Sequence, residues 1–388
     1  MRVLFVIDSL GAGGAEQSTA MLAERLLSMG VESSIATLYR AEVGFEAQVS
    51  AAHVPVHRIT GTGVAQRVRQ LRALTRQIQP DVLHTALFAA DQIGRLSAVG
   101  LPVKVVSSFV NTPRSKGYDP AVREWKRRVV NLVDAITGHM FVDQFHAVTE
   151  GVGALYADRY RIRTGKITVV ERGRDTALLG TRSPERRSDT RSRLGLDSGT
   201  PVVVAAGRHE PQKAHADLIR SMQVARKQFP NAMLLIAGRE GASTAQIKAT
   251  IQQCDATSWA RLLGHREDVA DLLAAADVMA LPSHFEGTAG IALEAMALGT
   301  PIASTDLKGM QGILVHERNA LISAIGDVDA MAASITRLLR DRALGERLGD
   351  AARDDFLDRF TLERSANRML AMYNDLAHPP TTERHAPN

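Results

Sequence analysis

The chain has 388 residues, of which 45% are hydrophobic and 23% charged, and its formal net charge is +5. This length predicts two domains, and the composition excludes a collagen, a coiled coil or a chain without a packed core. One cysteine, Cys254, excludes an intrachain disulfide and favours a reducing compartment.

Residues 3–7 form an apolar run that is too short for a signal peptide and predicts a buried first strand. Further strands of the first half are predicted over 34–38, 82–85, 103–107, 145–148 and 167–170, with helices over 15–29, 64–78, 91–99, 121–134 and 151–157. The second half repeats the scheme, with strands over 202–206, 233–237, 260–263, 278–281 and 301–304 and helices over 213–228, 244–253, 267–275, 289–298 and 329–339. Strands that are apolar on both faces and separated by helices indicate an α/β fold with two doubly wound, Rossmann-like domains.

The boundary between the two halves is predicted from composition. Residues 181–192 are polar and charged and contain a proline, which is typical of a loop or linker. We therefore expect domains over 1–180 and 181–360, and a C-terminal helix over 361–377 that returns to the first domain. The polar, proline-rich tail 378–388 is expected to be disordered.

The first strand leads into a glycine loop that contains Gly11, Gly13, Gly14 and Glu16. Glycines permit a tight turn, and the start of the following helix offers free amides to a phosphate or a polar sugar. A dinucleotide-binding loop would need a third glycine where Glu16 stands, which disfavours a dehydrogenase. The alternative is a tight turn that binds no ligand.

The most informative segment of the second half runs from Asp277 to Pro301. A strand ends near Pro282, Thr288 is expected to cap the next helix, and Gly299 suits the position just past its end. The carboxylates of Glu286 and Glu294 suit sugar and ribose hydroxyls, which donate hydrogen bonds to them. The alternative is that these two glutamates are solvated residues near a helix terminus. The predicted ligand-facing residues of this segment are Ser283, Glu286, Gly287, Thr288, Ala289, Gly290 and Glu294.

Two cations follow the strand over 202–206. Arg208 and Lys213 stand at its carboxyl end, the edge where open α/β sheets bind ligands. An arginine can hold phosphate oxygens in a bidentate manner, and a lysine supplies a point charge. The pair therefore predicts a diphosphate site, with ordinary surface cations as the alternative.

Taken together, Gly207-Arg208, Lys213, Ser283, Glu286-Gly287, Glu294 and Gly299-Thr300-Pro301 resemble glycosyltransferase family 4, which has the GT-B fold of two domains facing across a cleft. The eight-residue step from Glu286 to Glu294 is similar to the family's retaining signature, and the glycine loop and residues 166–175 also resemble family segments. The resemblance implies a retaining transferase that binds a nucleoside diphosphate sugar on the second domain.

In that reading Arg208 and Lys213 face the diphosphate, Glu294 the ribose and Glu286 the transferred sugar. Gly13 and Gly14 contribute to the donor site. The first domain holds a glycan or lipid-linked acceptor near Gly11, Gly13, Glu16, His84 and Asn111, and cleft closure brings the substrates together. The resemblance implies no metal and no cofactor beyond the nucleotide sugar, and it places the enzyme in cell-envelope or exopolysaccharide biosynthesis. Asp327-Val328-Asp329 matches the metal-binding aspartate pair of a different glycosyltransferase fold. These aspartates lie at a predicted helix start and are interpreted as capping residues.

The chain departs from the family pattern at two positions. Asn111 stands where the family usually has a histidine, and Arg172-Gly173 replaces an asparagine-glycine turn. Asparagine can bond a sugar hydroxyl but carries no proton at neutral pH. Asn111 therefore leaves open a binding or regulatory protein without turnover. An epimerase of the same fold is a third alternative, which no residue of the chain favours. His84 is a secondary acceptor candidate, with a structural histidine as the alternative.

A basic segment with aromatics over 114–128, and a second helix with Arg67, Arg69, Arg72 and Arg76, suit an anionic membrane surface. The alternative is a solvated helix face. No apolar stretch approaches the ~18 residues of a membrane span, so we expect a cytoplasmic protein that is peripheral at the inner face of the membrane. No nucleic-acid-binding pattern is present, so no nucleic acid partner is expected.

Overall fold

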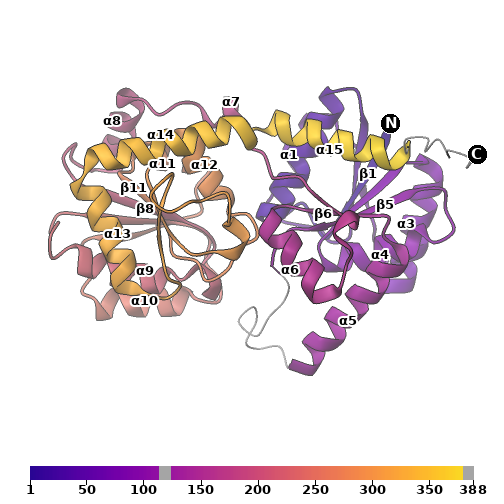
Figure 1. Ribbon diagram of the computed structural model, residues 1–388, viewed down its shortest axis with the longest axis horizontal. Coiled ribbons are helices and arrows are strands. Elements are labelled where there is room, and N and C mark those ends of the chain that lie inside the picture. Colours follow the sequence, from indigo (N-terminus) through magenta and orange to yellow (C-terminus); the bar gives the residue numbers. More distant parts are fainter. Residues whose placement is uncertain (113–123, 379–388) are drawn as a thin grey trace, which may run out of the picture. The chain divides into compact units, whose positions relative to one another are not determined.

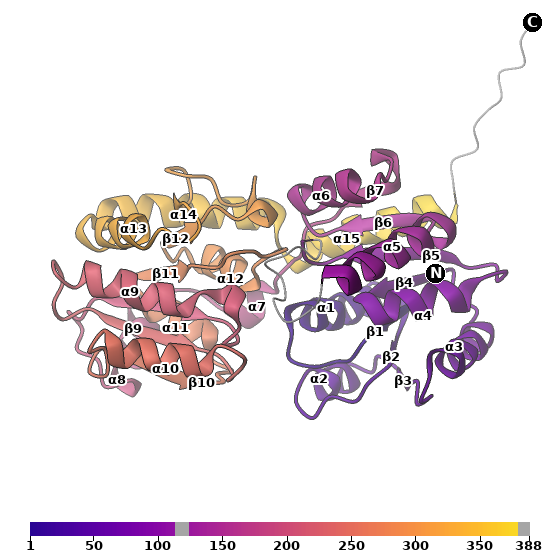
Figure 2. The same ribbon diagram turned by 90° about the horizontal axis from the view of Figure 1, so that it is seen from below.

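The computed structural model describes residues 1–112 and 124–378. The chain divides into two compact units, shown in Figures 1 and 2. Unit 1 comprises Met1–Gly173 and the C-terminal segment from Leu362, and unit 2 comprises Arg174–Thr361. The change of unit therefore falls at Arg174, ahead of the polar segment that composition suggested as the linker.

Unit 1 is built on a seven-stranded parallel sheet in the order β3-β2-β1-β4-β5-β6-β7. Alternate residues of β1 serve two different cores: Val3, Phe5 and Ile7 pack with α1 and α15, whereas Leu4 and Val6 pack toward α3 and α4. This alternation is what a strand covered on both faces requires. The strands are β1 (Arg2–Ile7), β2 (Glu32–Thr37), β3 (Val56–Arg58), β4 (Val82–Ala86), β5 (Lys104–Phe109), β6 (Gln144–Ala147) and β7 (Ile167–Val169). The helices are α1 (Gly14–Ser28), α2 (Glu46–Ala51), α3 (Val64–Ile78), α4 (Phe88–Ala98), α5 (Glu124–Phe141), α6 (Glu150–Tyr160) and α15 (Leu362–Ala377).

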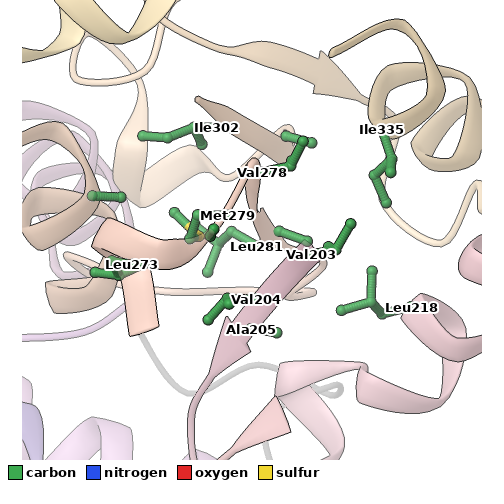
Figure 3. Packing of buried hydrophobic residues seen from close by; sticks show 14 of the residues in the cluster. Val203, Val204, Ala205, Leu218, Leu273, Val278, Met279, Leu281, Ile302 and Ile335 are labelled. Carbon is green, nitrogen blue, oxygen red and sulfur yellow. The ribbon is translucent and has the colours of Figure 1, made fainter. Parts of the chain in front are cut away.

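Unit 2 has a six-stranded sheet in the order β10-β9-β8-β11-β12-β13, in which neighbouring strands pair in parallel. Figure 3 shows side chains of β8 and β11 between Leu218 and Ile335 on one side and Leu273 on the other. The strands are β8 (Val202–Ala206), β9 (Met233–Ala237), β10 (Ala260–Gly264), β11 (Val278–Leu281), β12 (Ile302–Thr305) and β13 (Leu321–Ser323). The helices are α7 (Thr176–Leu179), α8 (Pro184–Arg193), α9 (His215–Ala225), α10 (Thr244–Gln253), α11 (Val269–Ala275), α12 (Gly290–Leu298), α13 (Val328–Arg340) and α14 (Arg342–Arg359).

The expected fold of two doubly wound domains is confirmed, but the loop expected over 181–192 is wrong. That segment contains α8, whose N-cap Ser183 accepts a hydrogen bond from the amide of Arg186, with Pro184 in the first turn. Two arginines of α8 are bound within unit 2: Arg187 and Arg191 donate to the two oxygens of Asp277 at 2.6 and 2.8 Å. The polar composition of residues 181–192 therefore belongs to a helix that is held by charged hydrogen bonds, and not to a linker.

Candidate functional site

The candidate donor residues lie where the strand order of the second sheet reverses. β8 pairs with β9 on one side and with β11 on the other, so the loops after β8 and β11 leave the same edge next to each other. Ligands of open α/β sheets bind at such a switch point. Arg208 follows β8 and Ser283 follows β11, so the topology brings the two predicted segments together.

At this edge Glu286 and Lys213 form a mostly buried ion pair. Lys213 Nζ lies 2.6 Å from Glu286 Oε1, and the hydroxyl of Ser283 donates to the same oxygen at 2.9 Å. Glu286 is only 8% exposed. Within residues 1–112 and 124–378, no donor is bonded to the second oxygen, Oε2. The site therefore offers a fixed carboxylate with one oxygen left for a hydroxyl donor.

Three features of the backbone hold this ion pair in place. The amide of His284 donates to the carbonyl of Gln212 at 2.8 Å, which joins the two loops. A Cβ at Gly207 would lie 3.2 Å from the side chain of Lys213, so glycine leaves room for the lysine stem. At Gly309 a Cβ would lie 2.0 Å from the carbonyl oxygen of Glu286, which permits only glycine against this loop.

Arg208 differs from Lys213 in its exposure. Its side chain is 57% exposed, and its Nη1 lies 3.9 Å from Oε1 of Glu210. His215, which the sequence analysis missed, supports the same loop through its Nε2, 3.2 Å from the carbonyl of Gly207. Burial lowers the pKa of His215 to about 4, so this ring is neutral and donates to the carbonyl. The arginine head is thus available to an anion.

The helix that carries Glu294 starts differently from the prediction. α12 begins at Gly290 with Ala289 as its N-cap, without a side-chain cap, so the expected capping role of Thr288 is wrong. The amide of Ala289 lies 3.3 Å from the sulfur of Met310. The other end agrees with expectation, since Gly299 takes the left-handed conformation at the end of α12, with φ of 64°.

Glu294 has a partner that sequence reasoning missed. Arg174 Nε lies 3.0 Å from Glu294 Oε1, and the arginine side chain is 2% exposed. A Cβ at Gly290 would lie 2.0 Å from an arginine nitrogen, so this glycine makes room for Arg174. The two partners are 120 positions apart in the chain. Only the resemblance of the segment around Arg174 could have pointed to it.

In unit 1 the glycine loop is shaped around Glu16. α1 begins at Gly14, and Gly13 is its N-cap without a side-chain cap. A Cβ at Gly13 would lie 2.3 Å from a carboxylate oxygen of Glu16, so the glutamate folds back over the loop. Gly11 forms an isolated bridge with Gly44.

Asn111 follows β5, and its side-chain oxygen accepts the amide of Thr112 at 2.9 Å. It lines a cavity of about 80 Å³ together with Asp91 and Tyr156. Burial is the main cause that raises the pKa of Asp91 to about 7. Asn111 therefore borders a polar hollow of unit 1 at the carboxyl end of β5.

His84 lies inside unit 1 in a hydrogen-bonded chain of five groups. The carbonyl of Val170 can only accept, so His146 Nε2 donates to it, at 2.8 Å. His146 Nδ1 then accepts from Ser108 at 2.7 Å, Ser108 accepts from His84 Nε2 at 2.6 Å, and His84 Nδ1 accepts from the hydroxyl of Tyr373. His84 is 4% exposed, and both its ring nitrogens are bonded. The structure thus places it as a buried link between β4 and α15.

The two buried histidines of this hydrogen-bonded chain predict that the folded protein loses stability in acid. Burial lowers the pKa of His146 to about 4 and that of His84 well below 6.5. The unfolded chain binds these protons near pH 6.5, so the stability that neutral His146 contributes is complete above pH 6.5 and is lost as the pH falls toward 4. The loss is on the order of 3 kcal/mol. Thermal unfolding between pH 8 and pH 4.5 measures it.

The variant His146→Gln should show a shallower fall of Tm between pH 6.5 and pH 5 than the wild type. His265→Gln, at an exposed histidine, is the control and keeps the wild-type profile. A wild-type Tm that stays flat from pH 7 to pH 5 would contradict the assignment.

Two further expectations concern metals and cations. Asp327 caps α13 by accepting the amide of Ala330 at 2.9 Å, as expected. Across the described part of the chain, no group of three or more His, Cys, Asp or Glu residues is placed to hold a metal ion. On the basic helix α3, Arg67 donates to the carbonyl of Gly61 and Arg72 to that of Ser97, so these arginines also serve the fold.

Comparison with known proteins agrees with this architecture. The family described as "Glycosyltransferase Family 4" matches residues 12–178, and "Glycosyl transferases group 1" matches residues 186–355. A D-inositol 3-phosphate glycosyltransferase of Nocardioides sp. is 25% identical over 93% of this chain and 85% of its own. The lipopolysaccharide core biosynthesis glycosyltransferase LpsE of Rhizobium meliloti is 28% identical over 47% of this chain and 52% of its own.

Solved structures share the fold. HepE of Anabaena, in complex with UDP, has a TM-score of 0.84 at 18% identity and covers 97% of this chain and 100% of its own. Sucrose-phosphate synthase of Thermosynechococcus elongatus has a TM-score of 0.83 at 21% identity, covering 97% and 99%. With two matching family segments and this fold, the chain belongs to the family 4 type of glycosyltransferases and is a glycosyltransferase of the GT-B fold.

Proposed function

We propose that this glycosyltransferase is a retaining enzyme that uses a nucleoside diphosphate sugar. The observation that carries the proposal is the Lys213–Glu286–Ser283 cluster beside the exposed Arg208, at the switch point of the second sheet. The cations suit a diphosphate, and the fixed carboxylates of Glu286 and Glu294 suit sugar and ribose hydroxyls. HepE, which shares the fold, has been solved with UDP and with UDP-glucose.

In the proposed reaction the leaving diphosphate assists attack from the same face of the sugar, so no dedicated base is needed. This chemistry tolerates Asn111 where a histidine is usual. Arg208, Lys213 and the start of α12 stabilise the developing negative charge, and the proposal needs no metal. Unit 1, with Gly11, Glu16 and Asn111, would hold the acceptor.

We further propose a glycan or lipid-linked acceptor and a role in cell-envelope or exopolysaccharide synthesis at the cytoplasmic face of the membrane. The name of LpsE, a lipopolysaccharide core enzyme, supports this setting. A second candidate, a binding protein without turnover, is favoured only by Asn111.

A thermal-shift panel of UDP and GDP sugars tests the donor. The true donor should raise Tm, because binding to the folded state at 100 times Kd adds about 2.7 kcal/mol. Slow hydrolysis of that donor separates an enzyme from a binding protein. NMR of the transferred sugar then gives the anomeric configuration: an inverted product contradicts the retaining assignment, and a panel without any shift contradicts the donor class.

A further inference from the structure

The helix α5 carries a stripe of apolar side chains on its solvent side, which we call the α5 stripe. The stripe residues are each between 41% and 66% exposed: Trp125, Val129, Leu132, Val133, Ile136 and Met140. At 3.6 residues per turn these positions fill one arc of roughly 100°. Single exposed apolar residues are ordinary, but a contiguous stripe marks a surface that binds a partner.

The opposite side of α5 is fixed to unit 1, so the stripe cannot turn inward. Arg95, which is 1% exposed, binds the carboxylate of Asp134 at 2.7 Å and the hydroxyl of Thr137 at 3.0 Å. A Cβ at Gly138 would lie 3.0 Å from the ring of Phe145, which shows how closely the helix approaches the sheet. Figure 1 shows the first turns of α5 running beyond the other helices of unit 1.

Two cations in the described part of α5 flank the stripe. At helical spacing Lys126 lies on one side of it and Arg128 on the other, and both side chains are exposed. Lys126 Nζ lies 5.7 Å from the ring centre of Trp125. Among the α5 side chains that the structure describes, the one carboxylate is Asp134, which is bound to Arg95 on the inner face. The described part of the exposed face of α5 therefore combines apolar groups with the cations Lys126 and Arg128.

We propose that the α5 stripe docks this protein on an anionic lipid surface, with the helix lying in the plane of the interface. Apolar side chains with a tryptophan enter the acyl boundary, and flanking cations bind acidic headgroups. A second copy packed on the stripe would set like charges against each other, which disfavours a dimer there. No helix in the described ranges is long and apolar enough to cross a membrane. The inference rests on the proposed function only for its setting.

Sedimentation of the full chain with vesicles tests the docking. The protein should bind phosphatidylcholine vesicles that contain about one-third phosphatidylglycerol at low salt, bind pure phosphatidylcholine weakly, and be released at high salt. Trp125 should report insertion by a blue shift of its fluorescence. Trp259 is buried at 6% exposure, so the variant Trp259→Phe isolates the signal of Trp125.

The double variant Val129→Asp with Ile136→Asp should lower vesicle binding at least about tenfold. Ile325→Asp with Leu357→Asp makes the same charge change at exposed apolar residues of unit 2 and should bind as the wild type does. Wild-type binding by the α5 variant overturns the proposal, as does a wild-type chain that dimerises through α5 or binds an acidic protein but no vesicle. A thermal shift with the sugar donor, measured on the same variants, distinguishes failure of the docking proposal from failure of the proposed function. A protein that binds vesicles but no donor contradicts only the proposed function.

Discussion

Replacing Glu286 with glutamine should lower kcat for sugar transfer by about 10²- to 10³-fold. The amide keeps the shape of the side chain but loses the charge that strengthens its hydrogen bonds to sugar hydroxyls. It also leaves Lys213 without its counter-ion at 2.6 Å. Steady-state kinetics with the donor found in the thermal-shift panel measures the change.

Two control variants distinguish the loss of the Glu286 charge from the loss of a neighbouring hydrogen bond and from the loss of a charge elsewhere. Ser283→Ala removes one hydrogen bond to Glu286 and keeps the charge, so its effect should stay near tenfold. Glu346→Gln changes an exposed glutamate that pairs with Arg342 on α14, outside the candidate site, and should leave kcat unchanged. Transfer at the wild-type rate by Glu286→Gln would refute the assigned role of this carboxylate.

Replacing Arg208 with alanine should lower kcat/KM for the nucleotide sugar by about 10²- to 10³-fold and weaken inhibition by the free nucleoside diphosphate. The reason is the loss of the cation that is proposed to hold the diphosphate. Because this side chain is 57% exposed, Tm should stay at the wild-type value. Product inhibition and donor kinetics measure the two effects.

Arg208→Lys should restore only part of the activity, because lysine keeps the charge but not the bidentate geometry. Arg342→Ala is the matched control, since that side chain is 92% exposed on α14. Unchanged inhibition by the nucleoside diphosphate in Arg208→Ala would contradict a diphosphate site at Arg208.

Most strands and helices of this fold could be predicted from local pattern. α3 has its predicted bounds because Gly63 precedes its apolar periodicity and Pro80 follows it. β3 and β13 escaped prediction because each has only three residues. β7 is as short, but its apolar run continues to Val170, which made the strand recognisable. α8 was missed for a different reason: its arginines bind Asp271 and Asp277, which lie far away in the sequence.

The candidate site was likewise predictable only in part. Arg208, Lys213, Ser283 and Glu286 stand at strand exits, so strand order alone brings them to one edge. The bond between Arg174 and Glu294 spans 120 positions, and no local signal reports it. The basic segment predicted over 114–128 lies mostly outside the described residues, and the apolar stripe of α5 becomes visible only once the inner face of the helix is known.

The return of α15 to unit 1 has a consequence for synthesis on the ribosome. Met369, Met372 and Tyr373 complete the core on one face of the first sheet, yet they are made only after all of unit 2. At typical elongation rates the synthesis of unit 2 takes about 10 to 40 s. During this time one face of the first sheet is not yet covered by α15. Unit 2, a continuous segment from Arg174 to Thr361, can complete its core first. A chain that stops before Leu362 would leave Tyr373 absent and His84 unbonded at Nδ1, so truncated products should depend on chaperones to stay soluble.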